Sequence, residues 1–306
     1  MDISNVFTQV LTLFILILVG YYARKKELID DEFTSKLSSL VMFFFLPCMI
    51  ISSMQIEYNP NMVSKIFLLI IISFFMYSIS FIIAYFSKYI FKSTNDLGIY
   101  QFVILFSNVG FMGYPIVQAI LGKEAIFYTA IFNLPFNLLI MTLGTFILCK
   151  NNNNYTFSIK TLINPVIISV FLGLLLFALN IRLPKFINNP IELLGSVTTP
   201  ISMLIIGSML FSSSALECFF NKSLYILSFI RLLLMPFIIY FLLKNILSDD
   251  ILLSIPIVIS AMPAASNTAI LANEYKANEG LASQAVFLST LFSIFTIPLI
   301  AGILLG

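Results

Sequence analysis

The stretch Asn108–Pro115 reads Asn-Val-Gly-Phe-Met-Gly-Tyr-Pro in the middle of an otherwise apolar segment. A second stretch, Ala261–Thr268, reads Ala-Met-Pro-Ala-Ala-Ser-Asn-Thr in a similar setting. Proline removes a backbone hydrogen bond, and each glycine costs a helix up to about 1 kcal/mol. In lipid, backbone groups freed in this way must be satisfied by protein or by a water-filled cavity. The two stretches therefore predict two broken helices.

The rest of the chain has the composition of a membrane protein. Of its 306 residues, 60% are hydrophobic and only 10% are charged, with a mean hydropathy of +1.04. A soluble domain carries about 25% charged residues. The net charge of +2 excludes a nucleic-acid-binding surface, and the absence of histidine removes the usual zinc ligand and catalytic base. The three cysteines are far apart and are interpreted as small buried residues, so we expect no metal site and no cofactor.

Ten apolar segments approach the roughly 20 residues that a membrane-spanning helix needs. They are Val6–Tyr22, Leu37–Ile56, Ile66–Tyr85, Leu97–Leu121, Ile126–Leu148, Pro165–Ile181, Leu193–Ser212, Leu224–Leu243, Ile251–Ala272 and Leu281–Leu305. Lys and Arg number ten in the loops after odd-numbered segments and five on the opposite side. By the positive-inside rule, both termini are expected outside the cell, and the Asn-rich linker 150–164 in the cytoplasm.

The ten segments form a repeat. Segments six to ten start about 154 to 159 residues after segments one to five. Because five is odd, the second set must enter the membrane inverted. The sequence thus predicts an all-α integral membrane protein with ten transmembrane helices in two inverted five-helix repeats, residues 1–149 and 165–306. The two broken helices occupy the matching positions four and nine. Inverted repeats with broken helices at the midplane are an architecture of secondary transporters.

The two breaks supply the candidate substrate site. Asn108 and Asn267 are expected to donate amide hydrogens to a carboxylate, next to the positive ends of half-helices. For one such helix a simple kink between packed helices would be the better interpretation, but two in symmetric positions favour a site. The predicted site residues are Asn108, Gly110, Gly113, Tyr114, Pro115, Pro263, Ser266, Asn267 and Thr268. The residues predicted to surround them are Gln101, Gln118, Asn133 and Asn137.

Charged residues in or beside the predicted spans are scarce. Arg231 lies in the first half of span eight, and we expect its side chain to extend to the cytoplasmic interface, although a charge inside the membrane is also a functional candidate. Glu274 ends span nine and is expected at the interface. No Asp or Glu lies well inside a span, which argues against proton coupling through a buried carboxylate. Sodium held by backbone carbonyls and Ser266, Asn267 or Thr268 stays open, as does uncoupled transport.

Several motifs resemble the bacterial branch of the auxin efflux carrier family, and the resemblance covers essentially the whole chain. The motifs are Asn108-x-Gly110-x-x-Gly113-Tyr114-Pro115, the stretch from Asn164-Pro165 to Leu183-Pro184, the run from Leu193 to Pro200, and the stretch from Met262-Pro263 to Glu274-Tyr275. The resemblance implies a fold shared with plant PIN carriers and, more distantly, with bile-acid symporters and sodium/proton antiporters.

The resemblance also implies a mechanism. In the family, helices one, two, six and seven form a scaffold, often dimeric, and helices three to five and eight to ten form a mobile transport domain. Helices four and nine cross at prolines, which match Pro115 and Pro263. An asparagine beside each crossover contributes to the organic-anion site, and Asn108 and Asn267 match these positions. The acidic residue in helix three of plant members has no counterpart in Ile66–Tyr85.

The sequence therefore predicts a secondary transporter with an elevator mechanism. Its substrate is expected to be a small organic anion, such as an auxin-like molecule or a mono- or dicarboxylate, carried across a bacterial plasma membrane. The expected partners are this anion, the lipid bilayer and a second copy of the chain through the scaffold helices, with no nucleic acid. A channel and an intramembrane enzyme on the same helical scaffold are the alternatives, although an enzyme is disfavoured by the missing histidines and paired carboxylates.

Overall fold

The computed structural model describes a helical chain over residues 3–57, 59–92, 96–149, 164–211 and 218–304. Within these ranges the only β-type pairing is an isolated antiparallel bridge between Ser107 and Ala264. The predicted linker 150–164 lies outside the described residues except for Asn164, which precedes a helix.

The first half of the chain contains two long uninterrupted helices and several that are assembled from shorter pieces. Its elements are α1 (Ile3–Lys25), α2 (Asp31–Leu40), the π-helical turn η1 (Val41–Phe45), α3 (Leu46–Ser53), α4 (Pro60–Phe86), the 3₁₀ turn η2 (Ser87–Tyr89), α5 (Leu97–Leu105), the π turn η3 (Val109–Gly113), α6 (Tyr114–Leu121), α7 (Glu124–Phe132), α8 (Leu134–Leu139), the π turn η4 (Ile140–Gly144) and α9 (Thr145–Leu148).

The second half of the chain is likewise built from short helices and one long helix. Its described elements are α10 (Pro165–Ala178), α11 (Lys185–Ser196), α12 (Thr198–Met209), α13 (Lys222–Phe229), the π turn η8 (Ile230–Leu234), α14 (Met235–Leu243), α15 (Asp250–Ser260), α16 (Thr268–Glu274) and α17 (Glu279–Leu304). Helices α5 and η3–α6 are separated by the unwound residues 106–108, and α15 and α16 by 261–267. The two predicted breaks are therefore present in the structure.

Among the residues that the structure describes, seven helices are long and apolar enough to cross a membrane. They are Phe7–Lys25, Asp31–Ser53, Met62–Tyr89, Glu124–Leu148, Lys185–Met209, Lys222–Leu243 and Glu279–Leu304. Three shorter apolar helices, Val109–Leu121, Pro165–Ala178 and Asp250–Ser260, do not reach that length. Two of the three adjoin a break, because an unwound segment divides an apolar stretch into parts that are each too short.

Polar side chains at the helix starts explain where several elements begin. Asn164 accepts a hydrogen bond from the Val166 amide at 2.8 Å and precedes Pro165, so α10 starts with both a cap and a proline suited to the first turn. Asp249 accepts from the amides of Ile251 and Leu252 at the start of α15.

Asp249 also ties the start of α15 to α4. Its carboxylate forms an ion pair with Lys65 near the start of α4. Burial alone would raise the pKa of Asp249, but the hydrogen bonds from Lys65 and from the two backbone amides outweigh that effect and hold the pKa below its ordinary value of 3.8. The charged form of Asp249 is therefore the one that this junction stabilises.

Of the four π turns within the described ranges, three end two residues before a proline. Pro47, Pro115 and Pro236 follow η1, η3 and η8 in this way. Proline lacks a backbone N–H and its ring clashes with the carbonyl four residues earlier, and the wider turn accommodates that clash. At Tyr114, for example, the amide bonds to the Val109 carbonyl, five residues back.

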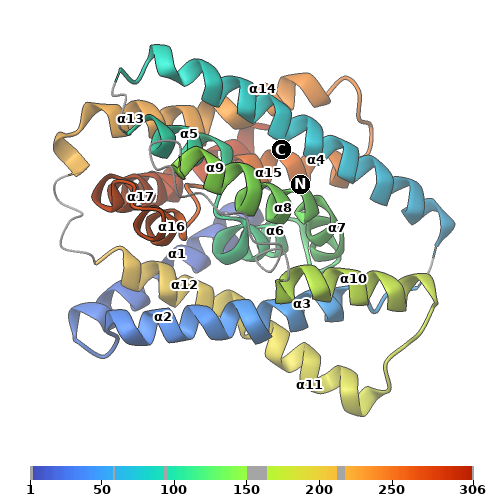
Figure 1. The fold of residues 1–306 in the computed structure, drawn as a ribbon. Coiled ribbons are helices and arrows are strands. Elements are labelled where there is room, and N and C mark those ends of the chain that lie inside the picture. The colour runs from blue at the N-terminus through green and yellow to red at the C-terminus, as the bar shows by residue number, and fades with distance from the viewer. Residues whose placement is uncertain (1–2, 58, 93–95, 150–163, 212–217, 305–306) are drawn as a thin grey trace.

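The helices gather into two groups that face each other. Figure 1 shows α2, α3, α11 and α12 along one side of the molecule and α4, α13 and α14 along the other, with α6, α8 and α15 between them. Helices α1 and α12 pack backbone to backbone, because a Cβ atom on Gly20 would overlap the Leu204 carbonyl and one on Gly207 would overlap that of Ile17. Such close contact is typical of small-residue packing between membrane helices.

Candidate functional site

The two unwound segments meet at the centre of the fold. The Asn108 amide donates to the Pro263 carbonyl at 2.8 Å, and the Ala265 amide donates to the Phe106 carbonyl at 3.1 Å. These bonds form the bridge between Ser107 and Ala264. Each break thus supplies partners for backbone groups that the other break leaves free, which is what an apolar environment requires.

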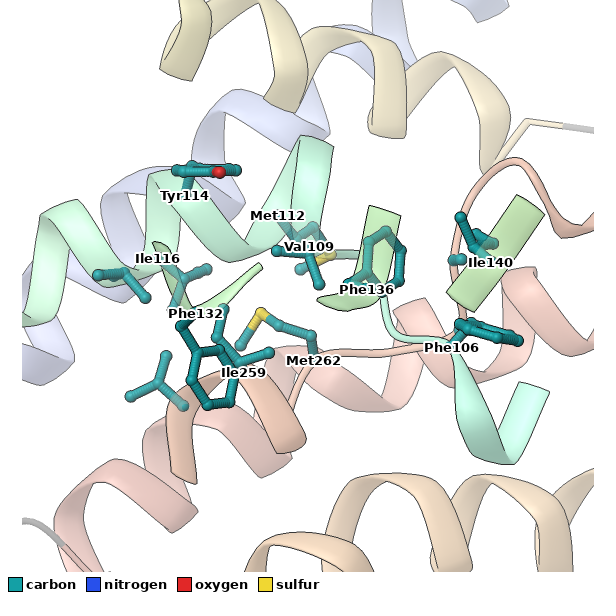
Figure 2. Packing of buried hydrophobic residues seen from close by; sticks show 14 of the residues in the cluster. Phe106, Val109, Met112, Tyr114, Ile116, Phe132, Phe136, Ile140, Ile259 and Met262 are labelled. Carbon is teal, nitrogen blue, oxygen red and sulfur yellow. The ribbon is translucent and has the colours of Figure 1, made fainter. Parts of the chain in front are cut away.

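A further helix bonds to the second break, and apolar side chains pack around the bridge. The Ala264 amide donates to the Ser289 hydroxyl on α17 at 3.1 Å. Figure 2 shows apolar side chains surrounding the unwound segments, among them Phe106, Phe136 and Met262, which are buried. Apolar side chains therefore cover much of the bridge.

Asn108 holds the two breaks together with its side chain as well. It is 3% exposed, and its amide nitrogen donates to the Ser266 hydroxyl oxygen at 2.5 Å. Its amide oxygen accepts from the Phe111 amide at 3.3 Å, which caps η3. Asn108 is thus a structural cap in addition to its predicted role in the site.

A cavity of about 50 Å³ lies beside the bridge. Seven predicted residues line it: Asn108, Gly110, Tyr114, Ser266, Asn267, Asn133 and Asn137. Its wall is completed by Ser107 and apolar residues that include Met42, Leu46 and Val166. The described lining contains no charged side chain, so an anion entering this cavity would meet no carboxylate.

Unpartnered polar groups converge on this cavity. The Ser107 hydroxyl is buried without a hydrogen bond among the described residues. The Tyr114 hydroxyl and the Asn133 amide are buried next to each other, and neither has another polar partner in this part of the chain. Asn267 begins α16 without capping it through its side chain. Buried polar groups are almost always hydrogen-bonded in folded proteins. Their concentration here indicates a place where a polar ligand or water binds.

The other predicted residues lie outside the small cavity and have structural contacts. Gly113 packs against Ile259, and the Thr268 hydroxyl donates to the Ala265 carbonyl at 2.5 Å. Gln101 donates to the Ala84 carbonyl at 3.1 Å, which joins α5 to α4. Pro263 is buried in the second break, whereas Pro115 is buried in the first turn of α6, beyond the unwound residues 106–108, and neither lines the cavity.

Gln118 lies instead in a second, larger cavity of about 610 Å³. There it accepts a hydrogen bond from Thr199 at 3.0 Å. The wall includes the ends of α3, α6 and α11, with polar residues such as Gln55, and an ion pair between Lys123 and Glu192 at 3.3 Å. The η1–α3 helix lines both cavities. Met42 and Leu46 belong to the wall of the small cavity, and Met49 and Ser52 to the wall of the large one.

The expectation for Arg231 was wrong. Its side chain does not extend to the interface but is 2% exposed and donates hydrogen bonds to the carbonyls of Met262, Ile104 and Ile259. Sequence reasoning also missed Ser107 and Ser289, since serine in an apolar span carries no distinctive signal. Glu274 is exposed at the end of α16, as expected.

Comparison with known proteins identifies the class of molecule. A family described as "Membrane transport protein" matches residues 5–158 and 153–301. The uncharacterized transporter MJ1031 of Methanocaldococcus jannaschii is 27% identical over 304 residues, which cover 97% of this chain and 98% of the relative. The uncharacterized transporter YfdV of Escherichia coli is 20% identical over 302 residues, and an uncharacterized transporter of Methanothermobacter thermautotrophicus is 24% identical over 294 residues. Both of these matches cover 95% of each chain.

These matches confirm the resemblance to the auxin efflux carrier family. Together with the seven apolar helices, they establish a multi-pass membrane protein that is a transporter and not an enzyme. The chain belongs to the membrane transport protein family.

Proposed function

We propose that this protein is a secondary carrier for a small organic anion, with its substrate site in the cavity at the bridge. The observation that carries the proposal is the convergence of Asn267, Tyr114, Asn133 and Ser107 on one buried cavity without a carboxylate. All four can donate hydrogen bonds to a carboxylate, and such donors are strong when the acceptor is ionised. The η3–α6 helix also begins at this cavity, and helix starts favour anions.

The size of the cavity supports a carrier that must move to bind its cargo. A cavity of this kind needs about 10–15 Å³ to hold one water, so about 50 Å³ admits a few waters or a small carboxylate group but no larger anion. The wall on one side comes from η1, α3 and α10, and on the other from the first break with η3 and α6, from Asn133 and α8, and from the second break. Displacing these two groups of helices would widen the cavity, and the larger cavity of about 610 Å³ offers a route towards it.

The proposed movement is of the elevator type. Helices α1, α2–α3, α10 and α11–α12 would form the scaffold, and α4–α9 with α13–α17 the transport domain. The close packing of α1 on α12 and of α3 on α10 and α11 supports a rigid scaffold. The proposal includes ten crossings in two inverted five-helix repeats, residues 1–149 and 165–306, in a bacterial plasma membrane with both termini outside. It also includes a homodimer through the scaffold, which the family resemblance supports.

Flux measurements test this function. Purified protein is reconstituted into liposomes, and uptake of radiolabelled malate, acetate and indole-3-acetate is measured. Protein-free liposomes give the background. We expect saturating uptake of at least one anion by wild type and a strong loss in Asn267→Ala. Exposed Asn273, on the same helix α16 but in the wall of neither cavity, provides the control variant Asn273→Ala, which should transport normally. Uptake that rises without saturation would favour a channel, and uptake that is equal in Asn267→Ala and wild type would overturn the site.

A further inference from the structure

Arg231 lies at the ends of the two interrupted helices and does not line the small cavity. Its Nε donates to the Met262 carbonyl at 3.1 Å, and its two terminal nitrogens donate to the carbonyls of Ile104 at 3.4 Å and Ile259 at 3.5 Å. Ile104 lies in the last turn of α5 and Ile259 in the last turn of α15. A single guanidinium group therefore contacts the ends of both interrupted helices.

The breaks themselves explain why these carbonyls need a donor. The helical partner of Ile259 would be the N–H of residue 263, which is proline and has none. The helical partner of Ile104 would be the Asn108 amide, which donates to Pro263 instead. The Ile259 carbonyl still accepts from the Met262 amide at 3.3 Å, whereas the Ile104 carbonyl has lost its helical donor to the other break. Arg231 supplies the donor that Ile104 lacks and a second donor to Ile259.

The charge of Arg231 is also matched by its surroundings. Helix C-termini carry a partial negative charge, and two of them converge here. No ion pair among the described residues includes Arg231. A group of backbone carbonyls at the ends of broken helices is the kind of site that binds a coupling cation in secondary transporters. In this protein the Arg231 side chain binds to these carbonyls.

We propose that Arg231 is a tethered cation that takes the place of a coupling ion at the crossing of the two broken helices. It neutralises the two helix ends, holds α13–α14 against both breaks, and leaves sodium unnecessary at this position. A second effect rests on the proposed function: the charge of Arg231 makes the electrostatic potential in the substrate cavity more positive and so favours an anion there. Arg231 acts through the bridge and is a positioning residue, not a contact of the substrate.

Thermal unfolding in detergent tests the tethered cation without any substrate. Wild type is measured in equal concentrations of sodium chloride, choline chloride and guanidinium chloride at low millimolar levels, beside Arg231→Ala, Arg231→Gln and Arg231→Lys. We expect wild type to melt at one temperature in all three salts. Arg231→Ala should melt several degrees lower and regain part of the loss in guanidinium, with sodium giving a smaller gain and choline none. Arg231→Lys should stay close to wild type.

Arg231→Gln keeps hydrogen-bond donors without the charge, so it separates the two roles if the alanine variant does not fold. We expect it to be stabilised by sodium over choline, because the helix ends regain a cation. Specific stabilisation of wild type by sodium would overturn the proposal, as would an Arg231→Gln variant as stable as wild type and insensitive to all cations. If wild type proves sodium-independent but moves no organic anion, the proposed function fails while the tethered cation stands.

Discussion

The side chain of Asn108 donates a hydrogen bond of 2.5 Å to the hydroxyl of Ser266, and this contact joins the two broken helices. Because Asn108 also caps η3, its amide is committed to protein partners at both ends. Asn267 lines the same cavity without capping its helix through its side chain. The two asparagines that match the family's crossover positions therefore differ in role, and substitution can separate them.

Asn267→Ala should lower transport at least about 10-fold, which corresponds to about 1.4 kcal/mol, with an unchanged melting temperature. Asn108→Ala should lower both the transport rate and the melting temperature. It removes an N-cap, which costs about 1 kcal/mol, and it also removes the hydrogen bond to Ser266. Uptake in liposomes and melting in detergent are measured on the same preparations. Equal melting of the two variants would contradict the capping role of Asn108.

Tyr114→Phe removes a buried hydroxyl whose only polar neighbour among the described residues is the Asn133 amide. Because a single neutral contact is lost, the melting temperature should change little. If the hydroxyl contacts substrate, the half-saturation concentration for uptake should increase several-fold. Tyr128→Phe is the control, because Tyr128 is buried but does not line the cavity. A Tyr114→Phe carrier with wild-type uptake would remove Tyr114 from the site.

Two glycine substitutions should affect different properties, one the stability and the other the substrate preference. Gly207→Ala places a methyl group against the Ile17 carbonyl and the Gly20 backbone, so α1 and α12 must separate, and overpacking of this kind costs about 1–3 kcal/mol. Gly110→Ala meets only the Met42 sulfur at 3.7 Å and should fold normally. Since Gly110 lines the small cavity, its alanine variant should transport the smallest anions in preference to larger ones. Melting curves and competition uptake measure the two effects.

The junction between Asp249 and Lys65 should make stability fall in acid. A carboxyl group whose pKa is lowered by folding contributes stability above its unfolded pKa, and this contribution disappears as the pH drops through the folded pKa. The contribution of Asp249 should therefore be complete above about pH 4 and decline at lower pH.

Variants of Asp249 separate the ion pair from the cap. Asp249→Asn keeps a good N-cap but loses the charge, and its melting temperature should depend less on pH than that of wild type below pH 4. Asp249→Ala loses both and should be the least stable at neutral pH. Melting scans across the acidic range measure these differences, and parallel acid curves for wild type and Asp249→Asn would rule out the ion pair as a source of stability.

The sequence was sufficient for the features that depend on local chemistry. Pro263 and the pair Gly110 and Gly113 locate the two breaks, because proline and glycine weaken a helix wherever it packs. The apolar runs locate the long helices for a similar reason. The cavity at the bridge was predicted only as a set of residues, since which side chains line it depends on how the breaks cross.

Arg231 shows why contacts between distant segments could not be predicted from the sequence. It lies in the π turn η8, before Pro236, where the regular helical period is interrupted. The face on which a residue lies cannot be assigned from a 3.6-residue pattern at such a turn. The carbonyls that Arg231 contacts are also about 30 and 130 residues away in sequence, so no local signal connects them.

The buried charge of Arg231 has an electrical consequence. Moving one elementary charge across the membrane potential involves about 2.3 kcal/mol per 100 mV. If the proposed transport domain carries Arg231 with it, an empty carrier moves one positive charge, a carrier with a monovalent anion moves none, and one with a divalent anion moves a net negative charge. Voltage would then act on the return of the empty carrier and not on the step loaded with a monovalent anion. Current recordings at different holding potentials would report the charge of the cargo before the cargo itself is known.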